Sequence, residues 1–233
     1  MVVALTAGVL VLTPGPALAV GTTRYSQSFH NNTVGADELF LPAAPVSRTN
    51  SACLTAAGNT TVGPLLSCPT FTDPQGAGKL RLTSAATSQL GGVFGGGSLP
   101  TSQGLDITFK TYQYGGNSPG ADSMAFVLAA VDPTAPTPPA VLGPSGGSLG
   151  YSAAFNGSTA GLSNGYLGIG FDVFGNFSSS TYQGSGCTNP PFIGARIPGQ
   201  VVVRGPGRLG VGYCGINSTA TSSASPPLAL RVW

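Results

Sequence analysis

The chain has 233 residues, a net charge of +2 and only 7% charged side chains, against roughly 25% in an ordinary soluble domain. Sparse charge without a basic run argues against nucleic acid as a partner, and the ample apolar residues exclude a polyelectrolyte-like disordered chain. With one glutamate (Glu38) and one histidine (His30), few groups are available for acid–base chemistry. The length suits one large all-β domain.

The first segment predicts export. Residues 2–12 are apolar, and residues 17–19 read Ala-Leu-Ala, which resembles the small-residue cleavage site of a secretory signal, although a basic start is missing. The apolar run is shorter than the about 20 residues of a membrane span. We expect a signal peptide over 1–19, a mature domain over 20–233 that is secreted or displayed at the cell surface, and no membrane insertion after cleavage. A buried core helix is the alternative.

Four cysteines fit the oxidising compartment that a signal peptide implies. The sequence alone allows three pairings. We expect Cys53 to pair with Cys68 and Cys187 with Cys214, because each pair joins sequence neighbours and closes a loop rich in Gly, Pro and Ser. A zinc site is not expected, since the chain has neither a CxxC pair nor a second histidine.

Short alternating segments, separated by clusters of Gly, Pro, Asn and Ser, predict strands, whereas no helical periodicity follows the signal. Residues 79–83 (KLRLT) alternate cleanly. Residues 105–110 (LDITFK) alternate too, and this predicts a strand with Leu105, Ile107 and Phe109 pointing inward.

Residues 124–131 (MAFVLAAV) are continuously apolar, which predicts a strand buried on both faces. Residues 132–148 are rich in Pro and Gly and predict a surface or binding loop. Further strands are predicted at 166–174, 200–204 and 228–233. Together the pattern predicts an all-β fold of two packed antiparallel sheets. Because the chain stops on an apolar strand, we expect the C-terminus to be truncated.

The segment YLGIGFDVFGN is the most informative part of the chain. Leu167, Ile169 and Phe171 alternate onto one face of the predicted strand, and Asp172 falls on the other face beside two glycines. The glycines predict a hollow on that face, with a carboxylate at its rim that can hold a cation or a polar ligand. The alternative is a strand end followed by a Gly-Asn turn, in which Asn176 caps its own backbone.

Three motifs in this order resemble the legume-type (L-type) lectin family. They are GADSMAFVLA (120–129), GGSLGY (146–151) and LSNGYLGIGFDVFGN (162–176), and the resemblance covers roughly residues 25–213. It implies a concanavalin A-like jelly-roll sandwich, the lectin and glucanase fold, in the form found in bacterial secreted proteins.

The resemblance also implies a sugar site formed by three loops. Asp122 matches the family's aspartate that accepts hydrogen bonds from two sugar hydroxyls, which is a strong, charge-assisted contact. Gly146 and Gly147 match a glycine pair that lets a backbone N–H approach the sugar. Asn176 matches the asparagine whose amide bonds a sugar hydroxyl while its oxygen faces a calcium ion.

The implied calcium ligands are Asp172, the carbonyl of Phe174, and Asn176. Calcium takes about 6–8 oxygen ligands. The family's second calcium aspartate would fall near Thr181, where this chain has none. We therefore expect calcium to bind weakly, unless waters or residues 178–181 complete its shell.

The family's transition-metal site is not expected here. Gly170 stands where the family has a glutamate, and Phe192 stands where it has a histidine. In the family the peptide before the sugar-binding aspartate is cis, and the metals help to hold it. With half of the cluster missing, the bond between Ala121 and Asp122 is expected to be either trans or held cis by packing alone.

Glycans or glycoconjugates are therefore the expected partners, and no enzyme activity is expected. The glucanases of this sandwich fold carry the pattern Glu-x-Asp-x-Glu on one strand. In the matching residues 170–174 of this chain, both glutamates are absent. A glycoside hydrolase is thus the weakest alternative, and a structural or adhesive surface domain is the stronger one. Four aromatic side chains are candidates for stacking on a sugar ring, but packing on the face of a sheet is the role we expect for them. They are Tyr112, Tyr114, Tyr151 and Phe155.

Overall fold

A computed structural model describes residues 23–35, 39–45, 48–56, 63–70, 72–102, 104–116, 118, 120–188 and 195–219. The predicted signal peptide (1–19), the predicted strand at 228–233 and Phe192 lie outside the described residues.

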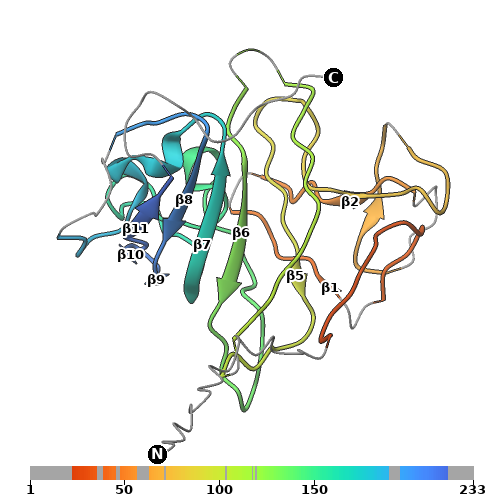
Figure 1. Ribbon diagram of the computed structural model, residues 1–233, viewed down its shortest axis with the longest axis horizontal. Coiled ribbons are helices and arrows are strands. Elements are labelled where there is room, and N and C mark those ends of the chain that lie inside the picture. The colour runs from red at the N-terminus through yellow and green to blue at the C-terminus, as the bar shows by residue number, and fades with distance from the viewer. Residues whose placement is uncertain are drawn as a thin grey trace, which may run out of the picture.

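The described chain is all β, as the sequence predicts, with short 3-10 turns and long irregular connections between strands (Figure 1). Among the described residues, no helix has the length and apolarity needed to cross a membrane. The strands are β1 (Leu39–Phe40), β2 (Cys53–Leu54), β3 (Leu66–Ser67), β4 (Leu80–Arg81), β5 (Phe94–Gly95), β6 (Met124–Ala129), β7 (Gly165–Asp172), β8 (Gln200–Arg204), β9 (Gly207–Arg208), β10 (Val211–Gly212) and β11 (Gly215–Ser218). The 3-10 turns are η1 (Gly146–Ser148), η2 (Asn176–Ser178) and η3 (Ser180–Tyr182).

The strands form three sheets. The largest has six strands, with β7 between β6 and β8, β11 beyond β8, and the β9–β10 pair joined to the start of β7. It lies on one side of the molecule, whereas β1, β2 and β5 lie on the other (Figure 1). The smaller sheets are β1–β5 and β3–β2–β4. The pairing is antiparallel except between β2 and β3, which are parallel, so the antiparallel prediction holds for all but one pair. The jelly-roll connectivity stays a prediction.

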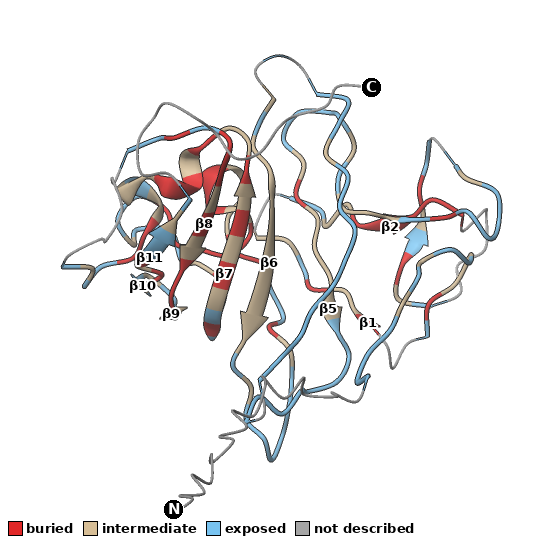
Figure 2. Ribbon diagram, viewed as in Figure 1, coloured by how far each residue is buried: buried red, intermediate tan, exposed pale blue. Residues whose placement is uncertain are grey.

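The glycine face of β7 is filled, so the predicted hollow is wrong. Gly168, Gly170 and Asp172 are buried, and from Leu167 to Asp172 the strand alternates between half-buried and buried residues (Figure 2). A β-carbon at Gly168 would overlap the ring of Tyr151, and one at Gly170 would overlap the ring of Phe177. Both rings are fully buried. The glycines admit these rings to close contact with the sheet, as strand glycines do where another group approaches closely.

The opposite, apolar face of β6 and β7 is covered less completely than predicted. All six residues of β6 are half-buried, so the prediction of a strand buried on both faces is wrong. The segment predicted as a strand at 105–110 has no ladder partner, and Leu105 and Ile107 are exposed rather than inward. Phe109 is exposed as well, but its ring contacts this face, with its centroid 5.6 Å from that of Phe126 and 5.9 Å from that of Phe171. With no ladder partner for residues 105–110 among the described residues, this segment covers the face only in part.

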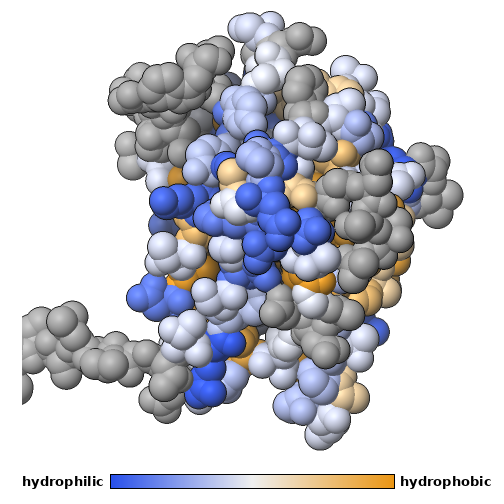
Figure 3. Space-filling view, turned by 90° about the vertical axis from the view of Figure 1, so that its right-hand side faces the viewer, coloured by the Kyte–Doolittle hydropathy of each residue, from blue (hydrophilic) through white to orange (hydrophobic). Residues whose placement is uncertain are grey.

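Two hydrophobic clusters stabilise the fold. One joins the small sheets around Leu54, Leu65 and Ala52. The other lies under the glycine face of the large sheet, around Tyr151, Phe177 and further buried residues of this half. The side of the molecule at the right of Figure 1 shows mixed polar and apolar patches, with no broad apolar surface among the residues drawn (Figure 3).

Both predicted disulfides are present. Cys53 on β2 pairs with Cys68, and Cys187 pairs with Cys214 between β10 and β11. Bonded cysteines of this kind are typical of proteins that fold in an oxidising, extracytoplasmic compartment.

Candidate functional site

Three segments far apart in the sequence meet at the carboxyl end of β7. They are the entry to β6 with Asp122, the turn η1, and the turn η2 with Asn176. The Asn176 Nδ2 donates to Asp122 Oδ1 at 3.3 Å. A β-carbon at Gly146 would lie 3.6 Å from Asp122 Oδ2. The residues that the sequence assigned to sugar binding are therefore brought together, although their role remains a prediction.

Asp122 is tied to the end of β7 through backbone contacts. The peptide between Ala121 and Asp122 is cis, one of the two states left open by the sequence. The Ser123 hydroxyl donates to the carbonyl of Asp122 and accepts from the Val173 N–H at 2.5 Å. The Phe174 N–H donates to the same carbonyl at 3.4 Å. These bonds fix the position of Asp122 relative to the end of β7.

The two glycines of η1 have different environments. Gly146 has a φ of +73°, which favours glycine, and it borders the carboxylate of Asp122. Gly147 is buried, and a β-carbon there would overlap Asn176 and lie 2.6 Å from the ring of Tyr182. Gly146 is thus the glycine beside the polar groups, whereas Gly147 allows η1 and η2 to pack closely.

Asp172 is fully buried at the end of β7 and not at the rim of a hollow. Its Oδ1 accepts from the Gly175 N–H at 2.7 Å, and its Oδ2 accepts from the Phe177 N–H at 2.6 Å. Burial raises the pKa of this carboxyl to about 6; the two hydrogen bonds oppose the rise, the charge of Asp122 adds to it, and that of Arg196 opposes it. The carboxylate thus holds the turn that carries Asn176, which is close to the turn alternative drawn from the sequence.

Ser178 ties the same turn to the segment before β8. Its hydroxyl lies 2.7 Å from the Gly175 carbonyl oxygen and 2.6 Å from that of Ala195, and it accepts from the Ile197 N–H at 3.0 Å. Since the hydroxyl is buried and already has these partners, it is not a free ligand for an ion.

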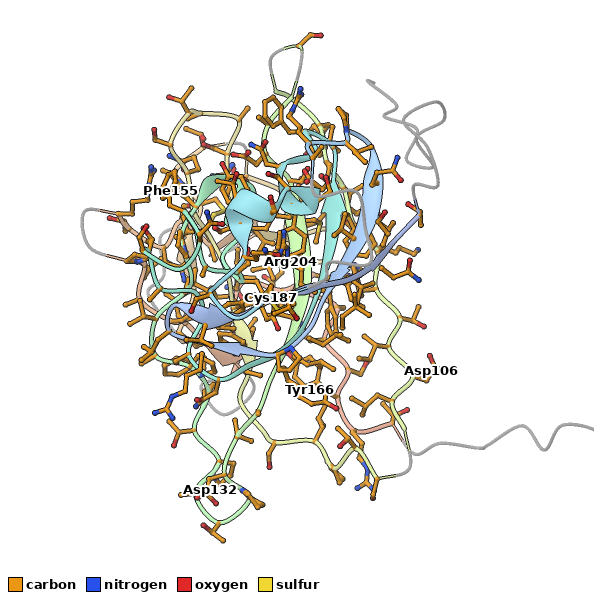
Figure 4. The ribbon with its side chains drawn as sticks, turned by 90° about the vertical axis from the view of Figure 1, so that its left-hand side faces the viewer. Asp106, Asp132, Phe155, Tyr166, Cys187 and Arg204 are labelled. Atoms are coloured by element: carbon orange, nitrogen blue, oxygen red, sulfur yellow. A yellow bond between two sulfur atoms is a disulfide. The ribbon has the colours of Figure 1, made fainter. Side chains whose placement is uncertain are left out.

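A buried arginine supports the turns from below. Arg204 of β8 is fully buried and donates from Nε to the Phe177 carbonyl at 2.9 Å and from Nη2 to the Ser179 carbonyl at 2.8 Å. Its Nη1 donates to the Tyr213 carbonyl at 2.7 Å. In Figure 4 it lies beneath the turns of this segment. It therefore fixes the height of η2 and η3 above the sheet.

Sequence reasoning missed Tyr182, a half-buried side chain at the end of η3. Its ring packs where a side chain on Gly147 would be, which places it beside the site. Its pKa is raised by burial and then by the negative charges of Asp122 and Asp172. A tyrosine in a turn rich in Ser and Thr carries no periodic signal, so only the folded contacts could reveal it.

The other aromatic candidates divide by burial. Tyr151 is fully buried against β7 and is a packing residue, as expected. Tyr112, Tyr114 and Phe155 are exposed, so the packing role expected for them is wrong.

The donor set fits calcium poorly. Of the expected ligands, Asp172 has both carboxylate oxygens bonded to backbone N–H groups, whereas Asn176 donates to Asp122 through its amide nitrogen and so keeps its oxygen available. No group of three or more His, Cys, Asp or Glu side chains that could hold a metal occurs within the described part of the chain. The guanidinium of Arg196, an exposed residue, lies 3.8 Å from the ring centroid of Phe174, whose carbonyl is another of the expected ligands.

The arrangement offers contacts suited to a neutral, hydroxyl-bearing ligand. Asp122 is half-buried, and its pKa is raised by burial, while the hydrogen bond from Asn176 opposes that rise. Around it stand the Gly146 backbone, the Asn176 amide and the face of Tyr182.

No protein-family model, curated protein or solved structure matches this chain.

Proposed function

We propose that this chain is an exported carbohydrate-binding domain of the legume-type lectin kind, secreted or held at the cell surface. The observation that supports it is the meeting of Asp122, Gly146, Gly147 and Asn176 at one sheet end, although they come from three separate segments. The resemblance to the lectin family singled out these residues, and that choice used no information on their contacts in the fold.

The chemistry follows from the exposed polar atoms. Asp122 Oδ2 lies beside Gly146, which has no side chain to cover it, so it can accept from sugar hydroxyls, and such charge-assisted bonds are the strong ones. Asn176 donates to Oδ1, which orients the carboxylate. The ring of Tyr182 supplies an apolar face for the C–H side of a sugar.

Hydrolysis has less support. Glycoside hydrolysis uses two carboxyl groups that flank the scissile bond. Asp172, which would be the partner of Asp122, is fully buried and has both oxygens bonded to backbone N–H groups. Asp106 and Asp132 project from the periphery, away from the buried Arg204 (Figure 4). A structural or adhesive domain remains the other interpretation of the same site.

The test is retention on immobilised mannose, glucose, galactose and N-acetylglucosamine, because immobilised sugars offset the weak affinity of a single site. The chain is expected to be retarded on at least one sugar. Asp122→Ala should lose that retention at an unchanged melting temperature, whereas Asp106→Ala, a matched control at an exposed aspartate, should keep it. Equal retention of both variants would remove Asp122 from the site.

A further inference from the structure

The expected calcium carboxylate, Asp172, already makes bonds within the chain. Its two oxygens accept from Gly175 and Phe177 at 2.7 and 2.6 Å, inside a fully buried turn. A carboxylate bonded in this way holds its loop without an ion, because the two N–H groups at the start of η2 donate hydrogen bonds to its negative charge.

The position of the expected transition-metal glutamate is filled as well. Gly170 stands there, and the ring of Phe177 packs onto it, with a terminal carbon of Leu149 3.1 Å from where a β-carbon would lie. Phe177 is fully buried. A hydrocarbon ring thus occupies the space into which a ligand side chain would project.

The link between the turn and the next segment is a hydroxyl. The Ser178 hydroxyl lies within hydrogen-bond distance of the carbonyls of Gly175 and Ala195, to either of which it can donate, and it accepts from the Ile197 N–H. It joins two segments 17 residues apart, from Ser178 to Ala195, a task that a shared ion performs when two loops both ligate it.

A positive charge lies over the ring of Phe174. The guanidinium of Arg196, an exposed residue, is 3.8 Å from the ring centroid of Phe174, which is a cation–π contact. Arg196 thus links the segment before β8 to the turn that follows β7.

We propose that the site loop is held by the chain's own groups, with the Arg196 guanidinium stacked on Phe174 as one of them, and that it binds its ligand without a metal. The inference rests on the proposed sugar-binding function and adds what organises its site. Arg196 acts as a positioning residue: it holds Phe174 and, through it, the segment that carries Asn176.

The experiment uses the mature chain, with calcium chloride as the probe. Thermal unfolding is followed in millimolar calcium chloride and in EDTA, and calcium is titrated calorimetrically. The melting temperature is expected to be the same in both solutions, with no saturable heat, because a ligand that binds only the native state would raise it. A calcium-dependent rise or a saturable binding heat would overturn the proposal.

Variants test the arginine. Arg196→Gln should lower the melting temperature by about 1–4 °C and weaken sugar retention. Arg196→Lys keeps the charge and should restore most of both, which a purely steric role would not predict. Arg208→Gln, at an exposed arginine of β9, is the control and should change neither. If Arg196→Gln matches Arg208→Gln, the arginine has no such role. The calcium and stability readouts need no sugar, so their failure is distinct from a failure of the sugar test at Asp122.

Discussion

Replacing Gly170 by alanine tests whether the glycine face of β7 is packed or hollow. The added β-carbon would overlap the Phe177 ring at one edge, lie 2.9 Å from its Cε1 and lie 3.1 Å from a terminal carbon of Leu149. Phe177 cannot slide freely, because its N–H donates to Asp172 and its carbonyl accepts from Arg204. Overpacking of this kind costs about 1–3 kcal/mol.

The expected result is a fall in the free energy of unfolding of about 1–3 kcal/mol, after a smaller opposing gain from the less flexible unfolded chain. In a domain of this size, this corresponds to a fall in melting temperature of about 2–12 °C. Urea and thermal unfolding are followed by circular dichroism with the disulfides intact. Gly95→Ala is the control, since that strand glycine has no atom within 4 Å of its β-carbon position.

A double variant sharpens the test. Phe177→Leu shortens the side chain that Gly170→Ala would strike, so the pair should lose less stability than the sum of the two single changes. If Gly170→Ala is as stable as Gly95→Ala, the ring does not pack against β7 and the predicted overlap is refuted. Strict additivity of the two changes would refute it as well.

Two further predictions concern pH and the disulfides. Burial raises the pKa of Tyr213 to about 12, so above pH 10 the unfolded chain loses this proton while the native protein keeps it, and stability should fall as pH rises from 10 to 12. Tyr213→Phe should flatten that part of a plot of unfolding free energy against pH, and an unchanged slope would contradict the prediction. Removing the disulfide Cys187–Cys214, whose cysteines are 27 residues apart, by replacing both with alanine should lower the free energy of unfolding by about 3–4 kcal/mol in urea titrations. A loss below about 1 kcal/mol would mean that the bond does not constrain the unfolded chain.

Some of the architecture could be predicted because it depends on local pattern. Alternation and turn residues located β7 and β8, and proximity in sequence gave the disulfide pairs. The resemblance to the lectin family selected Asp122 and Asn176, and the fold brings them within hydrogen-bond distance. These features need only short-range information or a pattern in the order of segments.

Other features depend on contacts between distant segments, which the pattern does not contain. Alternation shows which residues share a face of β7, but it does not show that Tyr151 fills the space beside Gly168. The inward direction of Leu105 presumed a partner strand, and no strand among the described residues pairs with that segment. Tyr182 reaches the site only because η3 folds back on η1.

The buried state of Asp172 has the same cause. A carboxylate after a strand predicts either an ion site or a turn cap, and the choice depends on which backbone N–H groups point at it. Here Gly175 and Phe177 provide them. The path of the chain after β7 decides between an ion site and a turn cap, and the short sequence between Asp172 and Asn176 does not determine that path.

A glycan array probed with the mature chain, once in calcium and once in chelator, with Asp122→Ala beside it, addresses both the sugar-binding function and its independence of metal. We predict binding to a defined subset of glycans that is equal in both solutions and absent for the variant. A sample that unfolds cooperatively yet binds no glycan would contradict the sugar-binding function. Binding that the chelator abolishes would keep that function but contradict the metal-independent site.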